Sequence, residues 1–417
     1  MLIHWIWLAH LPGVANREKL ALLRHFSDAE SIYFAQQDAY DLVQGLSPEA
    51  KADLENKNLS SSEAIMARCD RESIHLLTIR DAAYPARLKN IADPPVLLYY
   101  KGRLPDFDGN PVIGVVGTRK ASAYGLQTAK RIGYQIGRCG GIVVSGMAFG
   151  IDAMAMSGCL TAGQPVIGVL GCGVDMIYPV SNRALFADVE KFGCILSEFA
   201  PGTEPFKWNF PKRNRIISGL SCGVLVVEAP QKSGALITAR QAADQGRDVF
   251  VVPGNIDIPS FTGSNRLLRD GAIAVSSGWD ILSEYEALYP DKIHKDTAPA
   301  HQTVYEDEKE KADAMVAQSP LVPGKKENRE EEIQKNPIDN QSIPNYIDVN
   351  TILPKLSAEE GAIVMALKSG PRLVDDVIAE TGLTTGKVLA LLTILELKGV
   401  LRRLPGKHIS LKEMKWS

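Results

Sequence analysis

The chain has 417 residues, of which 45% are hydrophobic and 23% are charged, and this composition excludes a disordered or fibrous protein. Its length corresponds to about two to four domains, with ample sequence for a large buried core. The formal net charge of −3 argues against a nucleic-acid partner only as a sum, because an acidic segment can cancel a basic surface.

Counted by segment, most of the negative charge lies in one stretch. Residues 1–111 carry −3 and residues 112–290 carry +2, whereas residues 291–350 carry −5 and residues 351–417 carry +3. The six cysteines are scattered without a Cys-x-x-Cys pair, which predicts reduced thiols and no metal site. We find no cleavable leader and no run of about eighteen apolar residues, so we expect a cytoplasmic protein that does not contact a membrane.

Residues 1–80 are predicted to form a small helical domain of the SAM or helix-hairpin-helix type. Apolar residues recur at spacings of three and four, as at Leu22, Leu23 and Phe26. The turn at residues 11–14, Leu-Pro-Gly-Val, resembles a hairpin whose glycine amide approaches a phosphate, although a simple turn between helices explains it equally well. No contact is therefore assigned to it.

Residues 81–290 form the predicted core, an α/β Rossmann-like doubly wound fold with a mostly parallel sheet. Short runs rich in valine and isoleucine alternate with amphipathic helical stretches, a pattern typical of parallel strands covered by helices on both faces. The predicted strands are 112–116, 141–145, 166–170, 194–198, 224–227, 249–252 and 273–276.

The C-terminal third combines a linker and a third domain. Residues 291–350 are acidic and poor in large apolar residues, which predicts a flexible linker. Residues 351–417 show three helical patterns, at 358–368, 373–381 and 385–398, and then a hairpin over 400–411, the layout of a winged helix. The third helix opens with Lys387 as its single charge, which disfavours base-specific binding to duplex DNA.

The residues that follow the predicted strands suit a phosphate-bearing ligand, because ligands of open parallel sheets bind at the carboxyl ends of the strands. Glycine turns follow several strands and let backbone amides approach an anion at a helix start. Five cations accompany these turns: Arg119, Lys212, Arg213, Arg215 and Lys232. The sequence lacks the Gly-x-Gly-x-x-Gly fingerprint and the Gly-x-x-x-x-Gly-Lys-Ser/Thr loop, which disfavours an NAD enzyme and a P-loop ATPase.

No nucleophile and base pair is evident, so we expect no catalysis and no cofactor. All seven histidines lie outside residues 112–290. Asp152, Asp175 and Glu228 have structural interpretations, such as helix capping for Asp152 and an arginine partner for Glu228. Five aromatic residues near the strand ends are available to stack on unpaired bases, although we expect most of them to be core: Phe149, Tyr178, Trp208, Phe210 and Phe261.

These motifs closely resemble the bacterial DNA-processing protein A family, also called DprA or Smf. The resemblance rests on seven stretches in family order: Gly117-Thr118-Arg119-Lys120-Ala121-Ser122, the segment from Ser145 to Asp152, the segment from Gly171 to Asn182, the segment from Phe210 to Ser221, Ser233-Gly234-Ala235-Leu236-Ile237-Thr238-Ala239, Val251-Val252-Pro253-Gly254, and the segment from Gly263 to Ala272. It implies a homodimer that binds single-stranded DNA without base specificity and has no catalytic activity. It also implies loading of RecA during natural transformation, protection of the incoming strand and displacement of single-strand-binding protein.

The resemblance and the residues after the strands together give one candidate DNA-binding set: Gly117, Arg119, Lys120, Ser122, Ser145, Gly146, Phe149, Lys212, Arg213, Asn214, Arg215, Lys232, Ser233 and Gly234. Ala235 departs from the family, which often has serine there. The alternative function is a nucleotide-binding enzyme of the lysine-decarboxylase-like phosphoribohydrolase type on the same fold. That group typically carries Pro-Gly-Gly-x-Gly-Thr, which Pro253-Gly254-Asn255 interrupts.

Overall fold

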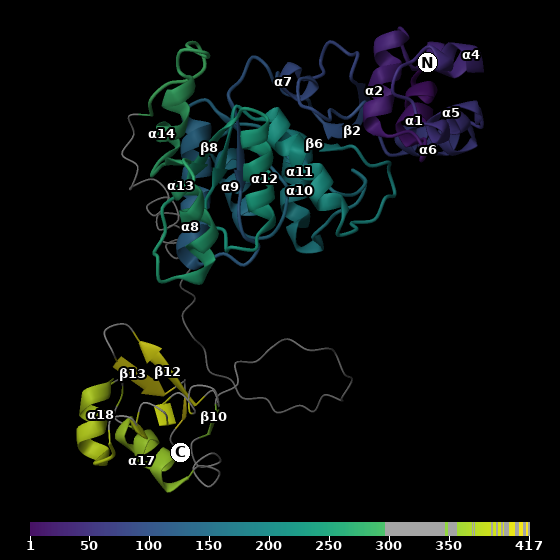
Figure 1. Ribbon diagram of the computed structural model, residues 1–417. Coiled ribbons are helices and arrows are strands. Elements are labelled where there is room, and N and C mark those ends of the chain that lie inside the picture. Colours follow the sequence, from purple (N-terminus) through teal and green to yellow (C-terminus); the bar gives the residue numbers. More distant parts are fainter. Residues whose placement is uncertain are drawn as a thin grey trace, which may run out of the picture. The chain divides into compact units, whose positions relative to one another are not determined.

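The computed structural model contains two compact units, Met1–Ala317 and Gln318–Ser417, which we describe separately (Figure 1). It describes residues 1–296 and, beyond them, residues 347–348, 357–368, 370, 372–384, 387–388, 391–392, 395, 400–404, 408–411 and 414–415. Within these ranges, no helix has both the length and the apolar content to cross a membrane.

The larger unit begins with six short helices packed around a core that includes Trp5 and Trp7. They are α1 (Leu2–His10), α2 (Asn16–His25), α3 (Ala29–Phe34), α4 (Gln37–Asp41), α5 (Pro48–Glu55) and α6 (Ser60–Arg71). In the turn between α1 and α2, the Gly13 amide donates to the Asp53 carboxylate of α5 at 2.5 Å. The turn is therefore bonded to α5, and its glycine amide already has an anionic partner within the chain.

A nine-stranded sheet forms the centre of the larger unit, in the order β1-β2-β6-β5-β4-β3-β7-β8-β9. The strands are β1 (His75–Thr78), β2 (Leu97–Gly102), β3 (Val112–Val116), β4 (Ile142–Ser145), β5 (Val166–Val169), β6 (Cys194–Ser197), β7 (Gly223–Val226), β8 (Asp248–Val251) and β9 (Ile273–Ala274). The seven strands from β3 to β9 are parallel, which confirms the predicted fold class.

Two further strands lie where the sequence analysis expected no strand. β1 and β2 extend the sheet antiparallel beyond β6, and β1 falls inside residues 1–80, predicted to form a helical domain. A strand of four residues directly after a long helix carries little periodic signal of its own, which explains the wrong prediction.

Helices cover both faces of the sheet. The helices of the larger unit after β1 are α7 (Ala86–Lys89), α8 (Ala123–Arg138), α9 (Ile151–Thr161), α10 (Arg183–Phe192), α11 (Asn209–Leu220), α12 (Gly234–Asp244), α13 (Thr262–Arg269) and α14 (Gly278–Leu282). Because crossovers between parallel strands are right-handed, α8, α9 and α10 cover one face, and α11 and α12 cover the other (Figure 1). The strand order reverses between β3 and β7, the point at which open parallel sheets bind ligands at the carboxyl ends of their strands.

Helices α8 and α9 pack unusually closely because glycines lie at their contact. A Cβ atom on Gly133 would lie 2.1 Å from the carbonyl oxygen of Ala155, and one on Gly158 would lie 2.1 Å from that of Lys130. The two backbones therefore touch. This contact holds the starts of both helices, and the loops that precede them, in a fixed relation.

The smaller unit has the elements of a winged helix. They are β10 (Ile347–Asp348), α17 (Ala358–Ala366), β11 (Arg372–Leu373), α18 (Val374–Thr381), β12 (Leu401–Leu404), β13 (His408–Leu411) and β14 (Met414–Lys415). The strands β11, β13 and β12 form an antiparallel sheet, and Ile363 and Val377 are buried between the helices and this sheet. Most of the third predicted helix, 385–398, and most of the predicted linker, 291–350, lie outside the described residues.

Candidate functional site

A small pocket at the carboxyl ends of the strands combines one cation with aromatic rings. It is lined by Arg119, Gly146, Ala148, Phe149, Tyr178, Pro179 and Phe210. The guanidinium carbon of Arg119 lies 5.1 Å from the centre of the Phe210 ring, and Tyr178 lies 5.7 Å from the same ring. Arg119, Phe149 and Tyr178 are exposed, and no carboxylate lines the pocket. The pocket thus offers an anion partner beside flat apolar surfaces.

Beneath the pocket, Gly146 separates the ligand side from a buried pair of opposite charges. The Gly146 amide donates to the Asp152 carboxylate at 3.1 Å, and a Cβ atom on Gly146 would lie 2.4 Å from the Arg213 guanidinium. Burial raises the pKa of Asp152 although the charge of Arg213 opposes this. Burial lowers the pKa of Arg213 to about 10, and Arg119 contributes to the shift. Arg213 also donates to the carbonyl oxygen of Val169.

This arrangement gives three candidate residues an internal role. Arg213 is 4% exposed, so its charge acts from below the pocket, where it lies 5.9 Å from the Phe210 ring. The Gly146 amide already donates a hydrogen bond to the Asp152 carboxylate. Asp152 therefore binds the loop before α9 and does not serve as the N-cap of that helix. Ser145 is fully buried, and its hydroxyl donates to the carbonyl oxygen of Val115 at 2.6 Å.

Two loops of the site follow β3 (residues 117–122) and β4 (residues 146–150), and their glycines let the two loops pack closely against each other. A Cβ atom on Gly117 would lie 2.5 Å from the side chain of Ile151, and one on Gly150, at a φ of 78°, would lie 2.5 Å from the carbonyl oxygen of Thr118. Met147 also has a positive φ, of 59°, which is unusual for a residue with a Cβ atom. The loops are thus held in one shape by their own contacts, and no phosphate is needed to explain the glycines.

The place between β3 and β7 where a dinucleotide-binding fold has its crevice is occupied by a side chain of this chain. Glu228, which follows β7, accepts hydrogen bonds from the amide of Ser122 at 3.1 Å and from its hydroxyl at 2.7 Å. The expectation that Glu228 binds an arginine was therefore wrong, because its carboxylate binds Ser122 at the start of α8. In a dinucleotide-binding fold the helix start at this crevice holds a pyrophosphate. A carboxylate already occupies that position here.

At the starts of α11 and α12, part of the candidate set faces solvent. Lys212, Lys232 and Gly234 are exposed, and nothing lies within 4 Å of a Cβ atom added to Gly234. The Ser233 hydroxyl accepts from the Ala235 amide and caps α12. Asn214 donates to the carbonyl oxygen of Gly234 at 3.4 Å and thereby joins the two helix starts.

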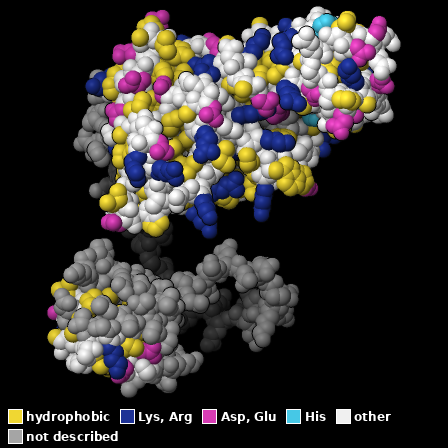
Figure 2. Space-filling view, viewed as in Figure 1, with side chains coloured by type: hydrophobic (Ala, Val, Ile, Leu, Met, Phe, Trp, Pro, Cys, Tyr) yellow, Lys and Arg dark blue, Asp and Glu magenta, His cyan; other side chains and the backbone are white. Residues whose placement is uncertain are grey.

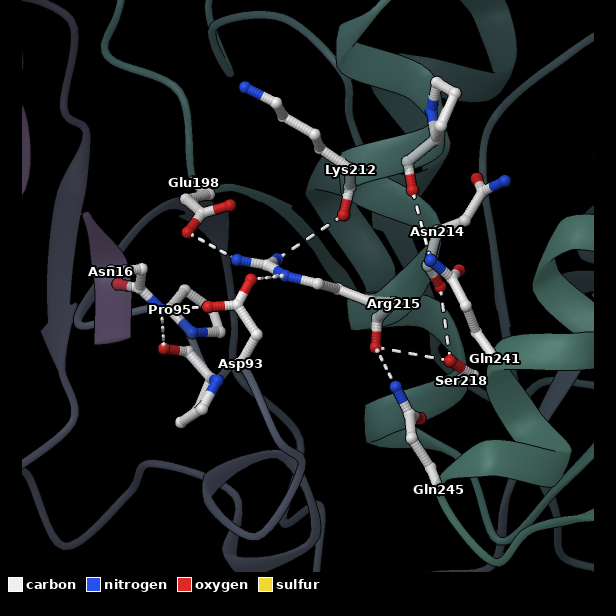
Figure 3. A network of polar contacts seen from close by, with 12 residues as sticks. Asn16, Asp93, Pro95, Glu198, Lys212, Asn214, Arg215, Ser218, Gln241 and Gln245 are labelled. Carbon is white, nitrogen blue, oxygen red and sulfur yellow. Dashed lines mark hydrogen bonds and ion pairs between the residues drawn. The ribbon is translucent and has the colours of Figure 1, made fainter. Parts of the chain in front are cut away.

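Arg215 is committed to a different part of the molecule (Figure 3). Its guanidinium contacts Asp93 at 2.8 Å and Glu198 at 2.8 Å, and Asp93 accepts from Asn16 of α2 at 2.6 Å. The amine of Lys212 points away from this network. Arg215 therefore ties the N-terminal helices to the core and departs from the expectation that it faces a phosphate.

The remaining candidates divide between surface and interior. Lys120 is exposed beside Arg119. Asp175, a candidate acid in the sequence, accepts from the Gly202 amide and pairs with Arg68 of α6.

In Figure 2, lysine and arginine side chains gather on the lower part of the larger unit in that view. All six cysteines are free, and no metal-binding group of His, Cys, Asp or Glu occurs within the described ranges.

The aromatic residues singled out in the sequence differ clearly in their exposure to solvent. Phe261 is 1% exposed and belongs to the core, whereas Trp208 is 64% exposed in the loop before α11. Phe206 stacks on Trp208, and the exposed Lys207 lies between them in sequence. Phe206 and Lys207 were missed as candidates. A lysine between two aromatic residues just before a helix start was the available signal.

Comparison with known proteins gives family matches for both units. The family model described as DNA recombination-mediator protein A matches residues 75–286, and the DprA winged helix domain model matches residues 350–407. The DNA processing protein DprA of Bacillus subtilis is 44% identical over 220 residues, which are 53% of this chain and 74% of that protein. Protein Smf of a Synechocystis species is 37% identical over 290 residues, which are 68% of this chain and 73% of that protein.

A solved structure agrees with these matches. The X-ray structure of DprA from Streptococcus pneumoniae superimposes with a TM-score of 0.61 at 33% sequence identity, covering 68% of this chain and 98% of that one. The second family model accounts for the winged-helix elements of the smaller unit. The chain therefore belongs to the DprA/Smf family of DNA recombination-mediator proteins.

Proposed function

We propose that this chain is a recombination mediator that binds single-stranded DNA without base specificity at the carboxyl ends of its strands. The observation that carries the proposal is the pocket in which the exposed Arg119 lies over Phe210 and beside Phe149 and Tyr178. A cation next to accessible rings suits a strand whose phosphates and bases are both exposed, and a paired duplex hides its base faces. The family description supports the same class of function.

Fluorescence anisotropy with labelled single-stranded and duplex oligonucleotides over a salt series tests this proposal. We expect tighter binding of the single strand and an affinity that falls linearly on a plot of log affinity against log salt. Equal affinity for the two forms, or no binding at moderate salt, would contradict it.

The finer functions implied by family membership form the second part of the proposal. The chain acts as a homodimer, protects single-stranded DNA, displaces single-strand-binding protein and loads RecA during natural transformation. A RecA ATPase assay on DNA precoated with single-strand-binding protein tests the loading step. We expect this chain to shorten the lag before ATP hydrolysis, and an unchanged lag would remove RecA loading. Sedimentation equilibrium tests the dimer.

The acidic segment 291–350 is proposed to tether the winged-helix domain of residues 351–417 to the core. Limited proteolysis tests this division. Early cleavage within residues 291–350 that releases two resistant fragments is the expected result, and resistance of this segment would contradict it.

A mononucleotide tests the phosphoribohydrolase alternative. Because Glu228 already bonds to the amide and hydroxyl of Ser122 at the start of α8, we expect adenosine monophosphate to leave the melting temperature unchanged. A clear rise with nucleotide, or release of free adenine, would favour the enzyme.

A further inference from the structure

An exposed pair of stacked aromatic rings precedes Phe210, a residue of the candidate pocket, in the sequence. The ring centres of Phe206 and Trp208 are 4.8 Å apart, and the ring planes differ by 5°. Their exposed fractions are 42% and 64%. Trp208 stands at the N-cap of α11 and makes no side-chain capping bond.

We propose that Phe206 and Trp208 form a platform on which an unpaired base of single-stranded DNA stacks. The inference rests on the proposed function and adds a base-contacting subsite outside the pocket. Stacking on an aromatic ring accepts every base, because each base has a π-face, and it therefore fits binding without base specificity.

The platform is continuous with the pocket along the chain. Phe210, which lies beneath Arg119, follows Trp208 by two residues. A strand whose phosphate meets Arg119 can therefore place a neighbouring base at the start of α11. The stacked pair lies on the connection between β6 and α11, and Phe210, in the first turn of α11, lines the pocket.

The charges near the platform favour a polyanion over an apolar protein surface. Lys207 lies between the two aromatic residues in sequence and is exposed, and Lys212 is exposed in the first turn of α11. Glu204 is the one exposed carboxylate between β6 and α11, and Glu198 is bound by Arg215. Cations beside accessible rings are the usual composition of a groove for single strands.

The test compares binding of an oligothymidylate with that of an oligonucleotide of equal length whose nucleotides are abasic, at one salt concentration. We expect Trp208→Ala to weaken binding of the oligothymidylate by about 5- to 100-fold, the range for loss of one base stack. Binding of the abasic strand should not change, because its phosphates remain. Trp208→Phe should restore most of the lost affinity.

Phe192→Ala is the matched control. Phe192 is 56% exposed with the Lys191 amine 4.8 Å from its ring, and it ends α10, at the opposite end of the strands. We expect this variant to bind both strands as the unchanged chain does.

Three results would overturn the platform while leaving the proposed function standing. These are unchanged oligothymidylate binding by Trp208→Ala, an equal loss for both strands, and a changed self-association with unchanged DNA affinity. The last result would mean that Phe206 and Trp208 contact a second copy of the chain and not DNA. If the unchanged chain binds neither strand, the proposed function itself fails.

Discussion

At the residue scale, two arginines two positions apart on α11 have different tasks. Arg213 is buried under Gly146 near Asp152, whereas Arg215 lies between Asp93 and Glu198. Burial raises the pKa of Asp152 and lowers the pKa of Arg213, so each charge depends on the other to offset its lost hydration. Neither arginine is a free cation on the surface.

Replacing Asp152 by Asn removes a buried negative charge and leaves the charge of Arg213 uncompensated. We expect a loss of about 3 kcal/mol in the free energy of unfolding, measured by urea denaturation. The double variant Asp152→Asn with Arg213→Met should recover part of this loss, because the remaining charge is also gone. A single variant as stable as the unchanged chain would show that the two charges do not depend on each other.

Salt dependence distinguishes a phosphate contact from a structural arginine. We expect Arg119→Ala to reduce the slope of log affinity against log salt by about 0.7, since one phosphate contact on a single strand is lost. Arg215→Gln should leave the slope unchanged, because both partners of Arg215 lie within the protein. Anisotropy titrations at four salt concentrations measure both slopes. A flatter slope for Arg215→Gln would place it on the DNA path after all.

At the element scale, the contact between α8 and α9 sets the position of the first two loops of the site. Both loops precede these helices, and they pack on each other through Gly117 and Gly150. Glycine usually weakens a helix by up to about 1 kcal/mol relative to alanine. Here the close approach of two backbones reverses that preference.

Alanine at the glycines of α8 should destabilise the protein in a predictable order. Gly133→Ala places a Cβ atom against the carbonyl oxygen of Ala155, which cannot move independently, so we expect a loss of about 2 kcal/mol. Gly137→Ala meets the Ala162 side chain at 2.7 Å and should cost less. Thermal and urea unfolding measure both variants. Equal or higher stability of Gly133→Ala would contradict the close contact.

Helix α1 carries a buried histidine, His4, that makes the fold more stable at neutral than at acidic pH. His4 is 1% exposed and stacks on Tyr33 at 4.6 Å, and burial and the nearby N-terminal amine lower its pKa. The unfolded chain then binds more protons than the folded one, so stability is lost as the pH falls below about 6.5. We expect His4→Phe to show a shallower loss between pH 7 and pH 5, by at most about 1.4 kcal/mol per pH unit. Urea unfolding across this range checks it, and parallel curves would contradict it.

At the scale of the whole molecule, the parallel sheet was predictable and its extension was not. Seven strands were found because parallel strands form short apolar runs, which are fully buried at Val112–Val116 and exposed at the edge strand Ile273–Ala274. The antiparallel β1 has only four residues and follows a helix closely, whereas β2 lies in an apolar run, Val-Leu-Leu-Tyr-Tyr at 96–100, that the prediction overlooked.

The sequence predicted which residues gather at the candidate site but not the contacts that each of them makes. Arg119 and Phe149 line the pocket as expected. Glu228 meets Ser122 from 106 residues away and Arg215 meets Asp93 from 122 residues away, and a local motif cannot reveal such partners. Residue type and spacing therefore predicted an anionic ligand, while the division of the cations into surface and interior required the fold.

The order of the strands has a consequence for the newborn chain. β3 pairs with β4, which follows it closely, and with β7, which the ribosome adds roughly 5–20 s later. During that interval the apolar edge of β3 is open to chaperones or to a neighbouring nascent chain. Phe210 emerges late in the same interval, so the protein acquires its pocket only near the end of core synthesis, and an unfinished core has no complete pocket to offer to DNA.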